Sequence, residues 1–161
     1  MWVAVVVIIL AVGIGLAVGL KQRSAGNQFM EAGRMIKRDI SFVETAEVFT
    51  LSETDFKNIV DMIKKADLSD TGVSAESNSE KQIVLFKAKG WAAQLHRLVE
   101  EREKCAYCFT FTAWQTYRGM PQNHVQMNLL LTAIEKVFLS IDPNTQVQAS
   151  RTKTKSKSSF F

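Results

Sequence analysis

The sequence predicts an α+β protein, built as an N-terminal transmembrane helix followed by a two-layer domain, in which helices pack on one face of an antiparallel sheet. Three observations predict this fold class. The chain begins with a long apolar run, several later segments are rich in β-branched and aromatic residues, and two more carry apolar residues at the helical period. Because the strand segments follow one another with only brief turns, they favour antiparallel pairing.

The same observations divide the chain into four regions. We expect a transmembrane helix at 1–20, a membrane-proximal linker with an amphipathic helix at 21–40, an α+β domain at 41–155, and a basic, aromatic tail at 156–161. A domain of about 115 residues is long enough to bury one core of its own. The low counts of Cys (2) and Pro (2) exclude a disulfide-stapled scaffold and a proline-rich chain.

The apolar run at 2–20 contains no charged side chain and no Asn, Gln, Ser or Thr. As a helix it would extend about 29 Å, which matches a hydrocarbon core of about 30 Å. The alternative is a cleaved secretory signal, for which the small residues at 24–26 offer a cleavage site. Such a signal carries basic residues before a shorter apolar core, whereas only Met1 precedes this one. We therefore expect a single-pass signal-anchor.

The charged residues predict the orientation of this anchor. Basic residues cluster after the apolar run and none precedes it, so the positive-inside rule places the N-terminus outside and the C-terminal domain in the cytoplasm. An extracytoplasmic domain is the alternative. The basic side chains that we expect at the membrane surface are Lys21, Arg23, Arg34, Lys37, Arg38, Lys153, Lys155 and Lys157.

The net charge of +4 lies entirely in the C-terminal tail. From residue 145 onward the chain has four basic side chains and no acid, and the rest of the chain has 16 of each. Basic residues near a bilayer are attracted to anionic lipid, although a charged edge strand in water is the simpler interpretation. The neutral remainder disfavours nucleic acid as a partner.

The domain begins with a predicted strand at 42–50. Ser52 is then expected to cap a helix that runs to about residue 66 with one apolar face. Before this domain, residues 29–40 have an amphipathic pattern, and that helix either lies on lipid headgroups or packs on its own domain. Residues 73–80 form a weak polar strand or a loop.

The strongest strand signals come next. Residues 82–88 are followed by a Lys-Gly turn, and 91–99 alternate as a strand, although they also fit a helix. The charged residues 100–104 make a hairpin tip before the strand at 105–117. A loop then leads to a helix at about 123–141, a turn at 142–144 and a final polar strand at 145–155.

The aromatic residues of this hairpin are the candidate binding surface. Strict alternation along 105–117 places Phe109 and Phe111 on the core face and turns Trp114 to the opposite face. If that face is open, it offers a surface for a partner or a ligand; the alternative is that another element covers it. The residues assigned to this surface are Trp91, Trp114 and Tyr117.

Candidate chemistry is sparse. Cys105 and Cys108 have the spacing of a redox pair, but such a pair works at a helix N-terminus and these two open a strand, where they point to opposite faces. A zinc site would need further ligands, and His96 and His124 show no motif-like partner. No phosphate-binding loop or nucleophile elbow occurs. We predict no catalytic, cofactor or metal residues and structural thiols in a reducing compartment.

These features lead us to expect a non-catalytic, membrane-anchored interaction module or a small subunit of a membrane-associated complex. Its expected partners are the lipid bilayer and either another protein or a second copy of the chain. The alternative is a membrane-tethered domain that binds a small apolar ligand or lipid between sheet and helix. An enzyme whose site has no recognisable motif is the third hypothesis.

Overall fold

The structure is a computed structural model that describes residues 24–52, 54–98 and 104–152. The chain forms two compact units, Met1–Lys37 and Arg38–Phe161. The expected transmembrane segment lies outside the described residues. No helix within those residues is long and apolar enough to cross a membrane.

The described part of the first unit contains one helix, at residues 24–31. Gly33 ends it with a left-handed backbone (φ +66°), while the amide of Arg34 donates to the carbonyl of Phe29 at 2.8 Å. Glycine is favoured at this position because it adopts positive φ without steric cost. The amphipathic helix predicted at 29–40 is therefore not formed as such: its first three residues end a helix, and residues 36–39 have no regular structure.

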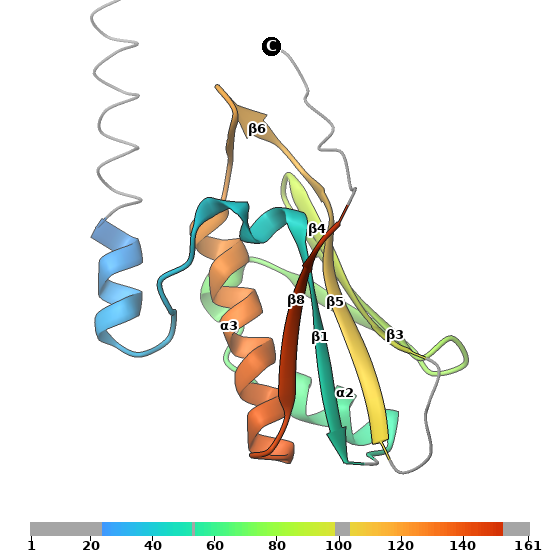
Figure 1. Cartoon of the computed structure of the whole chain (residues 1–161). Helices are drawn as coiled ribbons and strands as arrows, with labels where there is room; N and C mark the ends of the chain where they lie inside the picture. Colours follow the sequence, from blue (N-terminus) through green and yellow to red (C-terminus); the bar gives the residue numbers. More distant parts are fainter. Residues whose placement is uncertain (1–23, 53, 99–103, 153–161) are drawn as a thin grey trace, which may run out of the picture. The chain divides into compact units, whose positions relative to one another are not determined.

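The second unit has an α+β fold around a six-stranded antiparallel sheet, which confirms this part of the predicted fold class (Figure 1). The strand order is β2-β3-β4-β5-β1-β8. The strands are β1 (Thr45–Ser52), β2 (Ser74–Asn78), β3 (Ile83–Ala88), β4 (Trp91–Arg97), β5 (Lys104–Trp114) and β8 (Gln146–Arg151). A separate hairpin consists of β6 (Thr116–Tyr117) and β7 (Met120–Pro121).

Two helices, α2 (Phe56–Lys65) and α3 (His124–Ile141), pack on the same face of the sheet. Short 3-10 helices, η1 (Ile40–Glu44) and η2 (Ser69–Thr71), precede β1 and follow α2. Phe49 of β1 stacks on Phe138 of α3 with ring centroids 4.4 Å apart, and Tyr107 of β5 lies beside both Phe56 of α2 and Phe138. These rings fill the space between the sheet and the helices.

The first helix of the domain begins later than the sequence indicates. Asp55, not Ser52, is the N-cap of α2, and its side chain accepts a hydrogen bond from the amide of Lys57. Ser52 ends β1, and its amide and hydroxyl both donate to the carboxylate of Asp142, the C-cap of α3. The hydroxyl therefore joins the end of β1 to the end of α3.

A β-bulge in β5 changes the face on which its last residues lie. Phe111 pairs with Ala93, and Ala113 pairs with the adjacent residue of β4, Ala92. Two steps along β5 therefore correspond to one step along β4, and Thr112 is the extra residue. An extra residue reverses the alternation of side chains beyond it. Trp114 consequently turns back to the helix-covered face, where it is 2% exposed. The predicted position of Trp114 on the opposite face is therefore wrong.

Candidate functional site

The aromatic residues that the sequence assigned to a binding surface separate into two environments. Trp91 (4% exposed) and Trp114 (2%) are register partners, and both belong to the hydrophobic core. Tyr117 lies beyond them in the β6–β7 hairpin and is 58% exposed. The structure therefore brings the two indoles together as core residues and leaves only Tyr117 at the surface.

The basic residues expected at the membrane surface also lie in different environments. Lys21, Arg23, Lys153, Lys155 and Lys157 lie outside the described residues. In the first unit, Lys37 is exposed, and the guanidinium of Arg34 lies over the ring of Phe29, 5.3 Å from its centroid.

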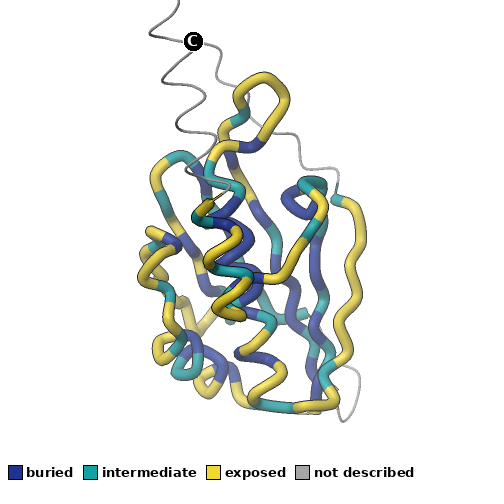
Figure 2. Tube along the Cα trace, turned by 90° about the vertical axis from the view of Figure 1, so that its left-hand side faces the viewer, coloured by how far each residue is buried: buried dark blue, intermediate teal, exposed yellow. Residues whose placement is uncertain are grey.

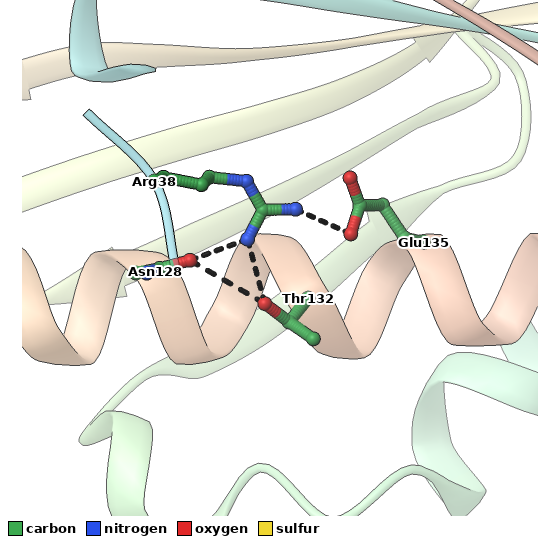
Figure 3. A network of polar contacts seen from close by, with 4 residues as sticks. All are labelled: Arg38, Asn128, Thr132 and Glu135. Carbon is green, nitrogen blue, oxygen red and sulfur yellow. Dashed lines mark hydrogen bonds and ion pairs between the residues drawn. The ribbon is translucent and has the colours of Figure 1, made fainter. Parts of the chain in front are cut away.

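Arg38, the first residue of the second unit, is the exception, because its side chain is only 9% exposed. Its Nη1 donates to Oδ1 of Asn128 and, at 2.7 Å, to Oγ1 of Thr132. Its Nη2 forms an ion pair with Oε2 of Glu135 (Figure 3). The expectation that Arg38 lies on the membrane surface is corrected by these contacts, since a guanidinium engaged with α3 is not available to lipid headgroups.

The three partners of Arg38 form a polar stripe on a mostly apolar helix. Asn128, Thr132 and Glu135 are four and three positions apart, so they lie on one side of α3. Thr132 also donates to Oδ1 of Asn128 at 3.4 Å. This spacing is visible in the sequence, and polar residues at the helical period within the apolar segment 123–141 are the signal from which the site could have been predicted.

Glu47 of β1 adds a second carboxyl group to this site. It lies on the same face of the sheet as Phe49 and Leu51 and is 7% exposed. Burial, mainly, raises the pKa of Glu47 from its ordinary value of 4.5 to about 7. The negative charge of Glu135 and a hydrogen bond with its side chain raise the pKa further, while the positive charge of Arg38 lowers it.

We call these five residues the Arg38 cluster: Arg38, Glu47, Asn128, Thr132 and Glu135. One guanidinium faces two carboxyl groups, and the pKa of Glu47 keeps a proton on this pair up to about neutral pH. A buried ion pair of this kind is more stable when hydrogen bonds satisfy its remaining groups. Asn128 and Thr132 accept from Nη1 of Arg38, whereas Oε2 of Glu47 has no hydrogen-bond partner among the described residues. The cluster thereby fixes the start of the second unit to both α3 and β1.

The thiols and imidazoles lie elsewhere in the sheet. Cys105 faces the core and pairs with Leu51, whereas Cys108 lies on the opposite face between Val48 and His96, as the alternation predicted. Both cysteines are free and buried. Burial raises the pKa of the Cys108 thiol, so it is not activated as a thiolate, although Nδ1 of the neighbouring His96 has no hydrogen-bond partner among the described residues.

Metal-ligating side chains do not gather in the described part of the chain. No group of three or more His, Cys, Asp or Glu residues in it is arranged to hold a metal ion. The Arg38 cluster has two carboxyl groups, but the guanidinium already supplies their positive charge.

Strand β8 forms one edge of the sheet and is exposed along its whole length (Figure 2). The amide of Thr152, just after β8, donates to the carbonyl of Glu44 at 2.8 Å. Alternate residues of an antiparallel strand bond to the same neighbour, so the amides of residues 150, 148 and 146 also point toward β1. The amides of Val147, Ala149 and Arg151 therefore point to the open edge, beyond which no strand of the described residues lies.

Comparison with protein-family models, with curated proteins and with solved structures gives no match for this chain.

Proposed function

We propose that the protein is a single-pass membrane-anchored interaction module, non-catalytic, and a small subunit of a membrane-associated complex. The partner contributes an extended segment that pairs with β8 as a further strand of the sheet. The apolar run at 2–20 supplies the anchor, and the basic residues after it favour a cytoplasmic domain with the N-terminus outside.

The observation that carries this proposal is the unpaired edge of β8. Three of its residues direct their backbone amides outward, and the side chains of all six residues are exposed. Such an edge binds an extended peptide through main-chain hydrogen bonds, and neighbouring side chains add selectivity. Val147, 43% exposed, offers an apolar contact beside the outward amides, and Arg151 favours a partner strand that carries an acidic residue.

The alternative function, binding of a small apolar ligand between sheet and helix, has less support. A ligand there would have to occupy the space where Phe49 stacks on Phe138 and where Tyr107 packs beside them. Displacing such aromatic contacts costs the core its packing energy, which a ligand would have to replace.

The test uses the full-length chain, solubilised from membranes with its bound partner. Proline at position 149 removes one outward amide and leaves the hydrogen bonds to β1 in place, and proline is tolerated on edge strands. We expect Ala149→Pro to reduce recovery of the partner by about tenfold or more, which corresponds to roughly one or two lost main-chain hydrogen bonds. Ala149→Ser is the matched control, because it keeps the amide, and should recover the partner as the wild type does.

Hydrogen exchange of the complex supplies a readout that does not depend on a substitution. The amides of Val147, Ala149 and Arg151 should become protected when the partner binds, whereas those of residues 146, 148 and 150 are already bonded to β1. If Ala149→Pro folds and retains the partner, or if the three amides exchange equally in the free and bound protein, strand pairing at β8 is wrong. Recovery of the wild-type chain alone and monomeric would contradict the interaction module itself.

A further inference from the structure

The β6–β7 hairpin presents two apolar side chains and a cation at its tip. Tyr117 and Met120 are direct register partners, so their side chains lie on the same face of the two-stranded ribbon. They are 58% and 53% exposed, the highest values among the large hydrophobic residues that the structure describes. The guanidinium of Arg118 lies over the ring of Tyr117, 5.3 Å from its centroid.

The backbone holds this tip in a defined shape. Arg118 and Gly119 both have positive φ, +50° and +77°, as the central residues of a type I′ hairpin turn require. The amide of Gln122 donates to the carbonyl of Gln115 at 2.8 Å and closes the base of the hairpin. Positive φ is uncommon for residues other than glycine, asparagine and aspartate, so the turn places Arg118 at the tip at some conformational cost.

The hairpin lies at the end of the domain where the chain both enters and leaves. Figure 1 shows β6 projecting beyond the end of α3, at the same end as the start of β1 and the finish of β8. The helix η1, which leads in from Arg38, contacts β7, and Thr152 bonds to the last residue of η1, Glu44. The residues that follow Thr152 in the sequence include Lys153, Lys155 and Lys157 and no acid.

We propose that Tyr117, Arg118 and Met120 form a second membrane contact, which lies in the headgroup region of an anionic bilayer. Tyrosine is enriched at the membrane–water interface, methionine can enter its apolar side, and arginine pairs with lipid phosphate. The inference rests on the proposed membrane anchoring. A lipid surface fits better than a protein partner because the chain enters this end 18 residues after the apolar run and leaves it into a basic tail.

The test places an environment-sensitive fluorophore on the tip of the full-length chain in vesicles. Met120→Cys is labelled with an NBD dye, since Cys105 and Cys108 are buried, and labelling of the wild type measures any background. Vesicles of phosphatidylcholine with about 30% phosphatidylserine are compared with phosphatidylcholine alone, because only the former carry a negative surface potential. Lys81→Cys is the matched control site, because it lies in the β2–β3 turn at the opposite end of the sheet.

We expect the label at position 120 to brighten about threefold or more and to shift to shorter wavelength in the anionic vesicles, while the label at 81 stays as it is in water. Arg118→Gln should lower the ratio of bound to free tip about fivefold, the effect of one basic residue at an anionic surface. If the chains stay in the vesicles and the label at 120 behaves like the label at 81, the inference about the hairpin tip is wrong, while the anchoring still holds. Release of the chain by alkaline carbonate would instead show that the anchoring is wrong. If the fluorescence of the label at 120 changes only after the β8 partner is added, the tip contacts that protein and not lipid.

Discussion

The guanidinium of Arg38, at the start of the second unit, forms an ion pair with the carboxylate of Glu135 in the middle of α3. The two residues are far apart in the sequence, and the pair lies mostly out of water. The ion pair therefore joins the first residue of the second unit to its long helix.

Replacing Arg38 with glutamine should destabilise the domain strongly. The substitution leaves Glu135 and Glu47 buried without their positive partner, and breaking one side of a buried ion pair costs about 3–5 kcal/mol. Urea unfolding of the full chain in detergent, followed by the near-ultraviolet circular dichroism of the buried aromatic residues, measures this loss.

Lys37→Gln is the control for Arg38→Gln, because it removes a neighbouring cation that is exposed. We expect it to change the free energy of unfolding by no more than about 0.5 kcal/mol. Equal midpoints for the two variants would show that the Arg38 cluster contributes nothing to stability.

Much of the fold could be predicted from local pattern, because each element carries its own periodicity. The helix expected at 123–141 is α3, and the strands expected at 82–88 and 91–99 are β3 and β4. The antiparallel sheet with helices on one face follows from the order of these elements and the shortness of the turns. Local pattern does not predict that β1 lies between β5 and β8, because these strands are far apart in the sequence.

The Arg38 cluster could not be predicted from the basic residue itself. Arg34, Lys37 and Arg38 look alike in the sequence, and a cation near an apolar run fits lipid, water or a buried carboxylate equally well. The partner is chosen by tertiary structure, since only the folded domain brings α3 beside residue 38. The role of Glu47 could not be predicted either, because its neighbours Val48 and Phe49 indicate only that this segment is a strand.

Glu47→Gln should change how stability depends on pH. The folded state holds a proton on Glu47 up to a pKa of about 7, whereas the unfolded chain releases it near 4.5. The folded state therefore binds more protons between these values, so the wild type loses stability as pH rises from about 4.5 to 7 and stays lower above that.

Glutamine is neutral at every pH and resembles the protonated carboxyl group in shape and in its ability to donate a hydrogen bond. We expect the variant to lack this decline and to be more stable than the wild type at pH 8 by roughly 3 kcal/mol. Unfolding curves recorded at intervals from about pH 5 to about pH 8, which span the raised pKa, decide the matter. Parallel pH profiles for the two proteins would mean that Glu47 is ionised in the folded state.

Asp142→Asn should show the opposite dependence. The amide of Ser52, the amide of Asn144 and the hydroxyl of Ser52 all donate to this carboxylate and hold the pKa of Asp142 below its ordinary value of 3.8. Its contribution to stability is present above that value and is lost as pH falls through the lowered pKa.

The melting temperature of the Asp142→Asn variant should therefore lie below that of the wild type at neutral pH, and the difference should shrink as pH falls below about 3.8. Glu80→Gln, which removes an exposed acid from the β2–β3 turn, is the control for the loss of one negative charge. A difference that stays constant down to about pH 2 would assign the effect to shape rather than to charge.

The bulge at Thr112 gives the sharpest contrast between the aromatic residues that the sequence grouped together. Trp114 is 2% exposed in the core and Tyr117 is 58% exposed at the hairpin tip, although both were assigned to one surface. Trp114→Ala should therefore cost about 3–5 kcal/mol of unfolding free energy, the usual effect of emptying a large buried aromatic site. Tyr117→Ala should change it by no more than about 0.5 kcal/mol.

Deleting Thr112 tests whether it is the extra residue of the bulge. Without it, Ala113 follows Phe111 directly, β5 pairs with β4 in unbroken alternation, and the indole of Trp114 stays on the helix-covered face as the partner of Trp91. The indole should therefore stay shielded from a soluble quencher such as acrylamide. Because Trp2 and Trp91 also fluoresce, the quenching of Trp114 is best measured in a Trp2→Phe, Trp91→Phe background. A deletion variant in which Trp114 is readily quenched would show that Thr112 is not the residue that the bulge adds.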